Sequence, residues 1–196
     1  MIDLTEFQSI SPYTDAEASE ALGKLADYPQ VNLFSQRFFP DQSPDFLKNV
    51  LKNIKTIDEF QVLVMQKFVR WVLENTAGEF TYEGIENVSG GKAFLALSNH
   101  RDIILDPAIT QLVLHINGIP MTEIAVGDNL ITNKAIEYLI RSNRMIKVVR
   151  GITARELYLS SQMLSKYIRL NIAGQRSSIW LAQRKGRTKN GYDTTE

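Results

Sequence analysis

Apolar and polar positions follow two different patterns, one after the other along the chain. From about residue 14 to residue 77, apolar residues recur at three- and four-residue spacing, which is typical of helices packed on one side. From about residue 78 onward, short apolar runs alternate with helical stretches. We therefore predict a helical N-terminal region, residues 1–77, and an α/β domain, residues 78–196.

Start signals mark several helices of the N-terminal region. Residues 14–17 (TDAE) and 56–59 (TIDE) both have the form of a capping box, in which a hydroxyl and a carboxylate bind exposed amides at a helix start. Pro44 suits the first turn of a further helix. The stretch 56–77 has only a narrow polar side, so we expect this helix to be largely covered.

The second part alternates between strand and helix patterns. The predicted strands are 79–88, 92–99, 121–127, 144–150 and 177–183, and the predicted helices are a stretch ending near Leu114, 129–143, and 154–174 with its end at Gly174. This order indicates an α/β fold with a mixed, partly parallel sheet flanked by helices. Functional groups are expected at the carboxyl ends of such strands, where His100, Arg150 and Arg184 stand.

Composition excludes several classes of site. The formal net charge is +0, so no overall field draws the protein to nucleic acid, and an anion site would have to be local. The chain has no cysteine, which excludes disulfides, thiolate metal sites and a cysteine nucleophile, and fits an intracellular protein. The first residues lack a signal-peptide pattern, and no apolar run reaches the roughly 20 residues of a membrane span, so membrane contact would be peripheral.

His100 is the first candidate for chemistry. It is one of only two histidines, and it stands where an apolar run breaks, with Asp102 and Asp106 close behind. Histidine titrates near neutral pH, and a neighbouring carboxylate would fix its tautomer and balance its charge after proton abstraction. The alternative is that Asn99 and Asp102 cap the next helix and His100 is a polar turn residue. His115 lies in an ordinary apolar stretch and is expected to be a core or edge residue.

Other catalytic sites have less support in the sequence. One histidine and two aspartates could bind a metal, but no cysteine and no second plausible histidine complete the set, so we expect no metal. A serine nucleophile lacks the GxSxG pattern, because Ser98 precedes His100 inside the strand.

A basic turn follows the last predicted strand. Arg184, Lys185, Gly186, Arg187 and Thr188 place guanidinium, ammonium and amide donors at a strand end, which suits recognition of phosphate. Arg150 is a second guanidinium at a strand end. Both could instead be solvated basic turns.

Three sequence blocks resemble those of a known family. In order they are GIENVSGGKAFLALSNHRDIILD, RMIKVVRG and IWLAQRKGRTKNG. They resemble the first three blocks of the glycerolipid acyltransferases, which include glycerol-3-phosphate and lysophosphatidate acyltransferases. The likeness covers about residues 79–193 and is strongest to a bacterial branch of 1-acyl-sn-glycerol-3-phosphate acyltransferases, whose third block resembles AQR-x-GRTK-x-G.

The resemblance implies an O-acyltransferase of phospholipid biosynthesis. His100 would be the general base, with Asp106 as its partner and Asp102 as the rival. Arg150 and the turn Arg184, Lys185, Gly186, Arg187 and Thr188 would bind the acceptor phosphate. The partners would be a lysophospholipid or glycerol phosphate acceptor and an acyl-CoA or acyl carrier protein thioester as co-substrate, with no resident cofactor. The expected location is cytoplasmic, with peripheral contact at the inner face of the membrane.

The sequence also departs from this family. The usual spacing leaves four residues between His and Asp, whereas one residue separates His100 from Asp102 and five separate it from Asp106. Lys185 stands where many members have Glu, and the fourth block of the family is missing, so we expect the α/β domain to be incomplete at its C-terminus. The alternative function is a non-catalytic module that binds lipid phosphates or another anion on the same scaffold.

Overall fold

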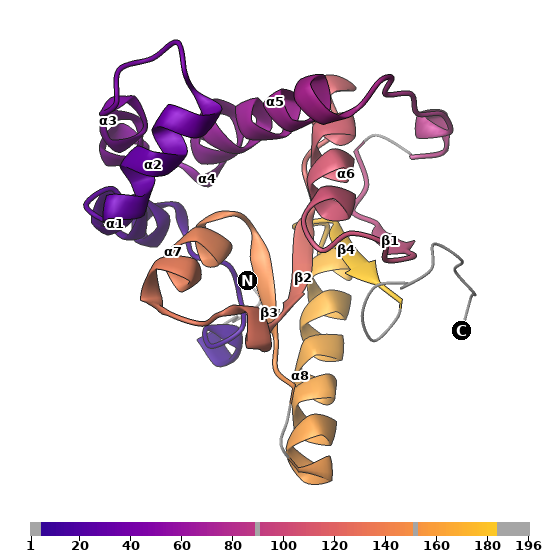
Figure 1. Ribbon diagram of the computed structural model, residues 1–196. Helices are drawn as coiled ribbons and strands as arrows, with labels where there is room; N and C mark the ends of the chain where they lie inside the picture. Colours follow the sequence, from indigo (N-terminus) through magenta and orange to yellow (C-terminus); the bar gives the residue numbers. More distant parts are fainter. Residues whose placement is uncertain (1–4, 89–90, 151–152, 184–196) are drawn as a thin grey trace. The chain divides into compact units, whose positions relative to one another are not determined.

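The computed structural model describes residues 5–88, 91–150 and 153–183. Its described residues divide into two compact units, which we call the sheet unit (residues up to Ile10, Glu79–Gly127, and Ile146 onward) and the helical unit (Ser11–Gly78 and Asp128–Met145). Figure 1 shows the elements of both. Within the described residues, no helix is both long enough and apolar enough to cross a bilayer.

The α/β fold class is confirmed by a four-stranded sheet flanked by helices. The sheet order is β1-β4-β2-β3, with β4 parallel to β1 and to β2. The strands are β1 (Leu95–Ser98), β2 (Glu123–Gly127), β3 (Met145–Val148) and β4 (Ile179–Ala182). The helices of the sheet unit are a short 3-10 turn (Thr5–Phe7), a second one (Ile85–Asn87), α6 (Leu105–Ile116) and α8 (Ala154–Ala173).

One face of the sheet is covered by α8. Ile146 and Ile179 are fully buried there and pack with Phe7 and with Tyr167 of α8. The Tyr167 hydroxyl donates a hydrogen bond to Glu123 Oε2 (2.8 Å), and burial, together with this carboxylate, holds the pKa of Tyr167 above its usual range. Tyr167 therefore stays protonated and fixes α8 to the start of β2.

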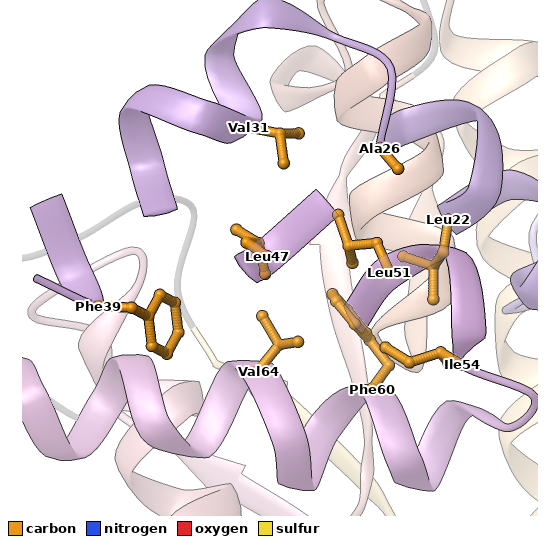
Figure 2. Close-up of a cluster of buried hydrophobic side chains, with 9 residues drawn as sticks. All are labelled: Leu22, Ala26, Val31, Phe39, Leu47, Leu51, Ile54, Phe60 and Val64. Carbon is orange, nitrogen blue, oxygen red and sulfur yellow. The ribbon is translucent and has the colours of Figure 1, made fainter. Parts of the chain in front are cut away.

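The helical unit has its own core. Its elements are α1 (Asp15–Leu25), α2 (Pro29–Phe38), α3 (Phe46–Asn53), α4 (Ile57–Phe60), a π-helical segment (Gln61–Met65), α5 (Gln66–Thr76), a 3-10 turn (Asp128–Leu130) and α7 (Lys134–Ser142). Figure 2 shows the buried side chains that fill this core: Leu22, Ala26, Val31, Phe39, Leu47, Leu51, Ile54, Phe60 and Val64. The prediction that helix 56–77 is largely covered is only partly confirmed, because Phe60 and Val64 are buried whereas Val62 and Leu63 are 36% and 42% exposed.

The predicted capping boxes are confirmed. Thr14 and Glu17 cap the N-terminus of α1, and Thr56 and Glu59 cap the N-terminus of α4. The hydrogen bonds that Glu17 accepts from the backbone and hydroxyl of Thr14 lower the pKa of Glu17.

Two details of the prediction are wrong. Residues 79–88 form no strand. This segment is irregular apart from the 3-10 turn Ile85–Asn87. Pro44 lies before α3, whose N-cap is Asp45, and it is Pro29 that stands at the first position of a helix, α2.

The two units do not follow the predicted boundary at residue 77. Residues 128–145, which come from the second half of the chain, pack in the helical unit. Tyr13 N–H donates to the carbonyl of Arg141 (3.0 Å), and the Arg141 guanidinium lies 4.2 Å from the centre of the Tyr13 ring. Such contacts join residues far apart in the sequence, so periodicity alone could not reveal them.

Candidate active site

The turn after β1 is shaped by the start of α6. Asp102 Oδ1 accepts hydrogen bonds from the backbone amides of Ile104 and Leu105, each at 2.8 Å. These amides lie at the helix start and have no carbonyl partner within the helix, so Asp102 acts as their cap. Pro107, in the first turn of α6, lacks an N–H that would need a partner. Asp102 therefore defines where α6 begins.

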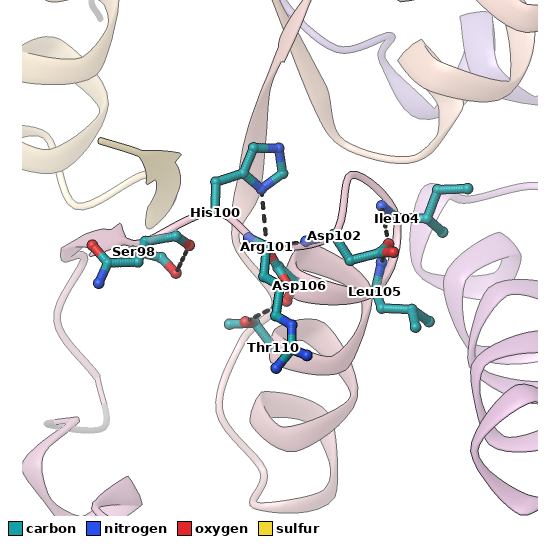
Figure 3. A network of polar contacts seen from close by, with 9 residues as sticks. Ser98, His100, Arg101, Asp102, Ile104, Leu105, Asp106 and Thr110 are labelled. Atoms are coloured by element: carbon teal, nitrogen blue, oxygen red, sulfur yellow. Dashed lines mark hydrogen bonds and ion pairs between the residues drawn. The ribbon is translucent and has the colours of Figure 1, made fainter. Parts of the chain in front are cut away.

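Three groups of the turn contact one carboxylate oxygen of Asp106. Its Oδ2 accepts from the backbone amide of Arg101 (2.6 Å), from that of Asp102 (2.9 Å), and contacts His100 Nδ1 at 3.0 Å, as Figure 3 shows. Asp106 is the second residue of α6, where the helix dipole also favours a negative charge. Of the two predicted partners of His100, the structure thus pairs it with Asp106.

The contact with Asp106 defines the tautomer of His100. An ionised carboxylate can only accept hydrogen bonds, so Nδ1 must carry the proton. In the neutral ring, Nε2 is then left as the acceptor. The side chains of His100 and Asp106 are 15% and 22% exposed, so the pair is partly shielded and still reached by solvent. This arrangement can take a proton at Nε2 while Asp106 balances the charge.

Trp180 adds a contact that the sequence did not predict. Its ring lies edge-on to the His100 imidazole, with ring centres 6.3 Å apart and planes at 73°. Trp180 is 3% exposed and stands on β4, where it pairs in register with Ala96 of β1. No periodicity in the sequence could show this, because it depends on β4 inserting next to β1.

The predicted phosphate-binding residues lie partly outside the described residues. Arg184, Lys185, Gly186, Arg187 and Thr188 are not among them. The last part of β4 is placed, however: Gln183 N–H donates to the carbonyl of Ser98 (2.9 Å), so the ends of β4 and β1 are neighbours.

Arg150 and His100 follow strands at opposite edges of the sheet. Arg150 is exposed and lies two residues beyond β3, whereas His100 lies two residues beyond β1. With about 4.8 Å between neighbouring strands, β1 and β3 are about 14 Å apart.

His115 is in the last turn of α6, about 15 Å along the helix axis from Leu105. Among the described residues, no three His, Cys, Asp or Glu side chains are arranged to hold a metal ion.

Comparison with models of protein families gives no match for this sequence, and comparison with curated proteins gives no significant one. The geometry around His100 is therefore the basis for the functional interpretation.

Proposed function

We propose that the protein is a glycerolipid acyltransferase, which moves a fatty acyl group from an acyl thioester to the hydroxyl of a glycerol phosphate or lysophosphatidate acceptor. The observation that carries the proposal is the His100–Asp106 pair, with Nδ1 at 3.0 Å from a carboxylate oxygen that two backbone amides also hold. The order of the sequence blocks around His100, Arg150 and Arg184 supports this choice of reaction.

The reaction needs one base and no covalent enzyme intermediate. His100 Nε2 takes the proton of the acceptor hydroxyl as its oxygen attacks the carbonyl carbon of the thioester. The carbon–sulfur bond then breaks, and the thiolate leaves with the proton that the imidazolium returns. Asp106 stabilises the imidazolium between these steps. General base catalysis of this kind contributes about 10²- to 10⁴-fold to the rate.

The turn that carries His100 also exposes apolar side chains. Ile103 and Ile104 lie in the turn between β1 and α6 and are 44% and 59% exposed. Covering exposed apolar side chains with an alkyl chain is favourable, because it removes their surface from water. In the proposed complex they contact the donor's acyl group.

The acceptor phosphate has cationic residues at two places in this proposal. Arg150 is at the β3 end of the carboxyl edge, and the residues from Arg184 to Thr188 follow β4, the strand next to β1. A glycerol phosphate bound between them would hold its free hydroxyl toward His100. The donor in this proposal is acyl-CoA or acyl carrier protein, and the reaction takes place in the cytoplasm, at the inner face of the membrane.

Release of free thiol from an acyl thioester tests the proposal. The assay contains palmitoyl-CoA or palmitoyl acyl carrier protein with lysophosphatidate, and a thiol reagent follows the product. His100→Ala should reduce turnover by about 10²- to 10⁴-fold, whereas His115→Ala, the other histidine, should keep it. Circular dichroism checks that both variants fold.

Two outcomes contradict the proposal. Undiminished turnover in His100→Ala would remove His100 as the base. A wild-type protein that binds lysophosphatidate but releases no thiol with either donor would instead be a non-catalytic module that binds lipid phosphate.

A further inference from the structure

One hydrogen bond does not fix the orientation of the His100 ring. The contact between Nδ1 and Asp106 Oδ2, at 3.0 Å, constrains one atom of the imidazole. The torsion about the Cβ–Cγ bond of histidine has broad minima, so the ring can still tilt about this hydrogen bond. Because Nε2 is on the far side of the ring from Cβ, a tilt displaces Nε2 strongly. A second contact on the ring is therefore needed to fix the position of Nε2.

The indole of Trp180 supplies such a contact. The centres of the two rings are 6.3 Å apart and their planes meet at 73°, which is within the range of edge-to-face aromatic pairs. Trp180 is 3% exposed, whereas the side chain of His100 is 15% exposed. The indole thus borders the imidazole on the protein side, and solvent still reaches the imidazole.

The sheet holds Trp180 from both sides. β4 pairs with β1 and with β2, and Trp180 is in register with Ala96 on the first and with Ile124 on the second. Ile179, the preceding residue, packs in the core that α8 covers, so the side chain of Trp180 points to the opposite face of the sheet. Residues in register share a face, and Ala96 is the smallest of the three. It therefore leaves space for the indole above β1.

The backbone of His100 is tied to the same pair of strands. Gln183 N–H donates a hydrogen bond to the carbonyl of Ser98 (2.9 Å), so β1 stays paired with the chain after β4 until two residues before His100. Groups on paired strands keep their geometry more accurately than groups on loops. The strand pairing, rather than a loop, thus brings Trp180 next to His100.

Electrostatic attraction between the indole and a charged imidazole adds little to this contact. A cation is attracted to the face of an aromatic ring when it lies within about 6 Å of the ring centre. At 6.3 Å, the centre of the His100 ring lies just outside this range. The main effect of Trp180 is therefore steric, because the indole restricts the orientations that the imidazole can adopt.

We propose that Trp180 is a positioning residue for His100. It holds the imidazole in the orientation in which Nε2 faces the acceptor hydroxyl, while Asp106 fixes Nδ1. The role in turnover rests on the proposed acyltransferase function, whereas the effect on the orientation of the ring does not. A displacement of a reacting group by about 1 Å can lower a rate on the order of 10²-fold, so restricting the ring contributes to kcat.

NMR spectroscopy tests the orientation of the ring without an assay of activity. The chain has two histidines, so His115→Ala leaves one imidazole to observe. In this variant, we expect nuclear Overhauser effects between protons of the Trp180 indole and protons of the His100 ring. At alkaline pH, where histidine is neutral, the nitrogen chemical shifts should report a proton on Nδ1. Adding Trp180→Met should move both nitrogen shifts toward a mixture of tautomers, because a tilting ring keeps its hydrogen bond only part of the time.

A double-mutant cycle on thiol release tests the role in turnover. Trp180→Met should lower kcat by about tenfold to 10²-fold and leave the KM for lysophosphatidate unchanged. In His100→Ala, the same substitution should cause no further loss, because no imidazole remains to be positioned. Trp180→Phe keeps an aromatic ring and should recover most of the lost turnover. Ile146→Ala is the control for a loss of core packing, since Ile146 is fully buried on β3, at the other edge of the sheet, and this variant should keep kcat.

Four results would overturn the proposal. They are absence of Overhauser effects between the two rings, wild-type nitrogen shifts in a folded Trp180→Met variant, wild-type kcat in that variant, and a loss of kcat that is equally large with and without His100. The last result would show that Trp180 acts independently of the base.

Failure of the proposed function gives a different result. A wild type that releases no thiol contradicts the acyltransferase proposal, while the NMR measurements still decide whether Trp180 orients the ring. Circular dichroism checks that each variant is folded. If Trp180→Met does not fold, Trp180→Phe replaces it in the NMR comparison, because the smaller ring should move the nitrogen shifts of His100 in the same direction.

Discussion

Replacement of Asp106 by Asn removes the negative charge at the centre of the candidate site and almost keeps the shape of the side chain. The amide has almost the same shape as the carboxylate, and its oxygen can still accept from the amides of Arg101 and Asp102. Three contacts converge on Asp106 Oδ2, at 2.6, 2.9 and 3.0 Å. A hydrogen bond to a charged group contributes about 1 kcal/mol more than a neutral one. Since the side chain is partly solvated, we expect a loss of about 1–3 kcal/mol in the free energy of unfolding.

The effect on turnover should be much larger than the effect on stability. The Asn oxygen can take the place of Oδ2 and face the two amides and His100 Nδ1, but no charge remains to stabilise the imidazolium. General base catalysis contributes about 10²- to 10⁴-fold to the rate, so we expect kcat to fall by a factor within this range. Thiol release at saturating lysophosphatidate measures kcat, and urea unfolding measures stability.

Asp102→Asn is the matched control for this prediction. Asn caps helices about as well as Asp, so the amides of Ile104 and Leu105 keep their acceptor. We expect Asp102→Asn to change stability by less than about 0.5 kcal/mol and to leave kcat within a few-fold of the wild type. If Asp106→Asn keeps near-normal turnover, the pair has no catalytic role. If Asp102→Asn is the variant that loses turnover, the assigned partner of His100 is wrong.

Two further predictions concern contacts that the sequence did not reveal. Gln61 is 2% exposed and accepts a hydrogen bond from Arg144 Nε at 2.8 Å. Gln61→Leu should therefore lower the free energy of unfolding in urea by about 1–3 kcal/mol. An unchanged urea midpoint would show that water replaces this hydrogen bond. Because the rings of Trp180 and His100 lie edge-on with centres 6.3 Å apart, His100→Ala should change the tryptophan emission spectrum, whereas His115→Ala should leave it unchanged. Equal emission from His100→Ala and the wild type would refute the contact.

Local features of the fold could be predicted from the sequence because their physical causes are local. The capping boxes at Thr14 and Thr56 need only four residues each, and both are present. The helix ending at Gly174 was predicted for the same reason. The strand prediction for residues 79–88 is wrong because alternating apolar residues are not specific to strands. The same alternation occurs here in an exposed, irregular segment that pairs with no neighbouring strand.

The composition of each unit could not be predicted, because it depends on which distant segments pack together. The assignment of α7 to the helical unit rests on contacts such as that between Tyr13 and Arg141. Trp180 beside His100 likewise follows from the sheet order, in which β4 separates β1 from β2. A pattern along the chain carries no information on that order.

The same distinction separates the two halves of the candidate site. His100, the amides of Arg101 and Asp102, and Asp106 belong to seven consecutive residues, and their geometry needs only that β1 ends and α6 begins where Asp102 caps it. The residues proposed to bind phosphate instead include Arg150, which follows β3, and residues that follow β4 in the sequence, so their proposed meeting depends on the order of the whole sheet. Substitutions that disturb strand order should therefore weaken acceptor binding, seen as a raised KM for lysophosphatidate, while the His100–Asp106 pair persists.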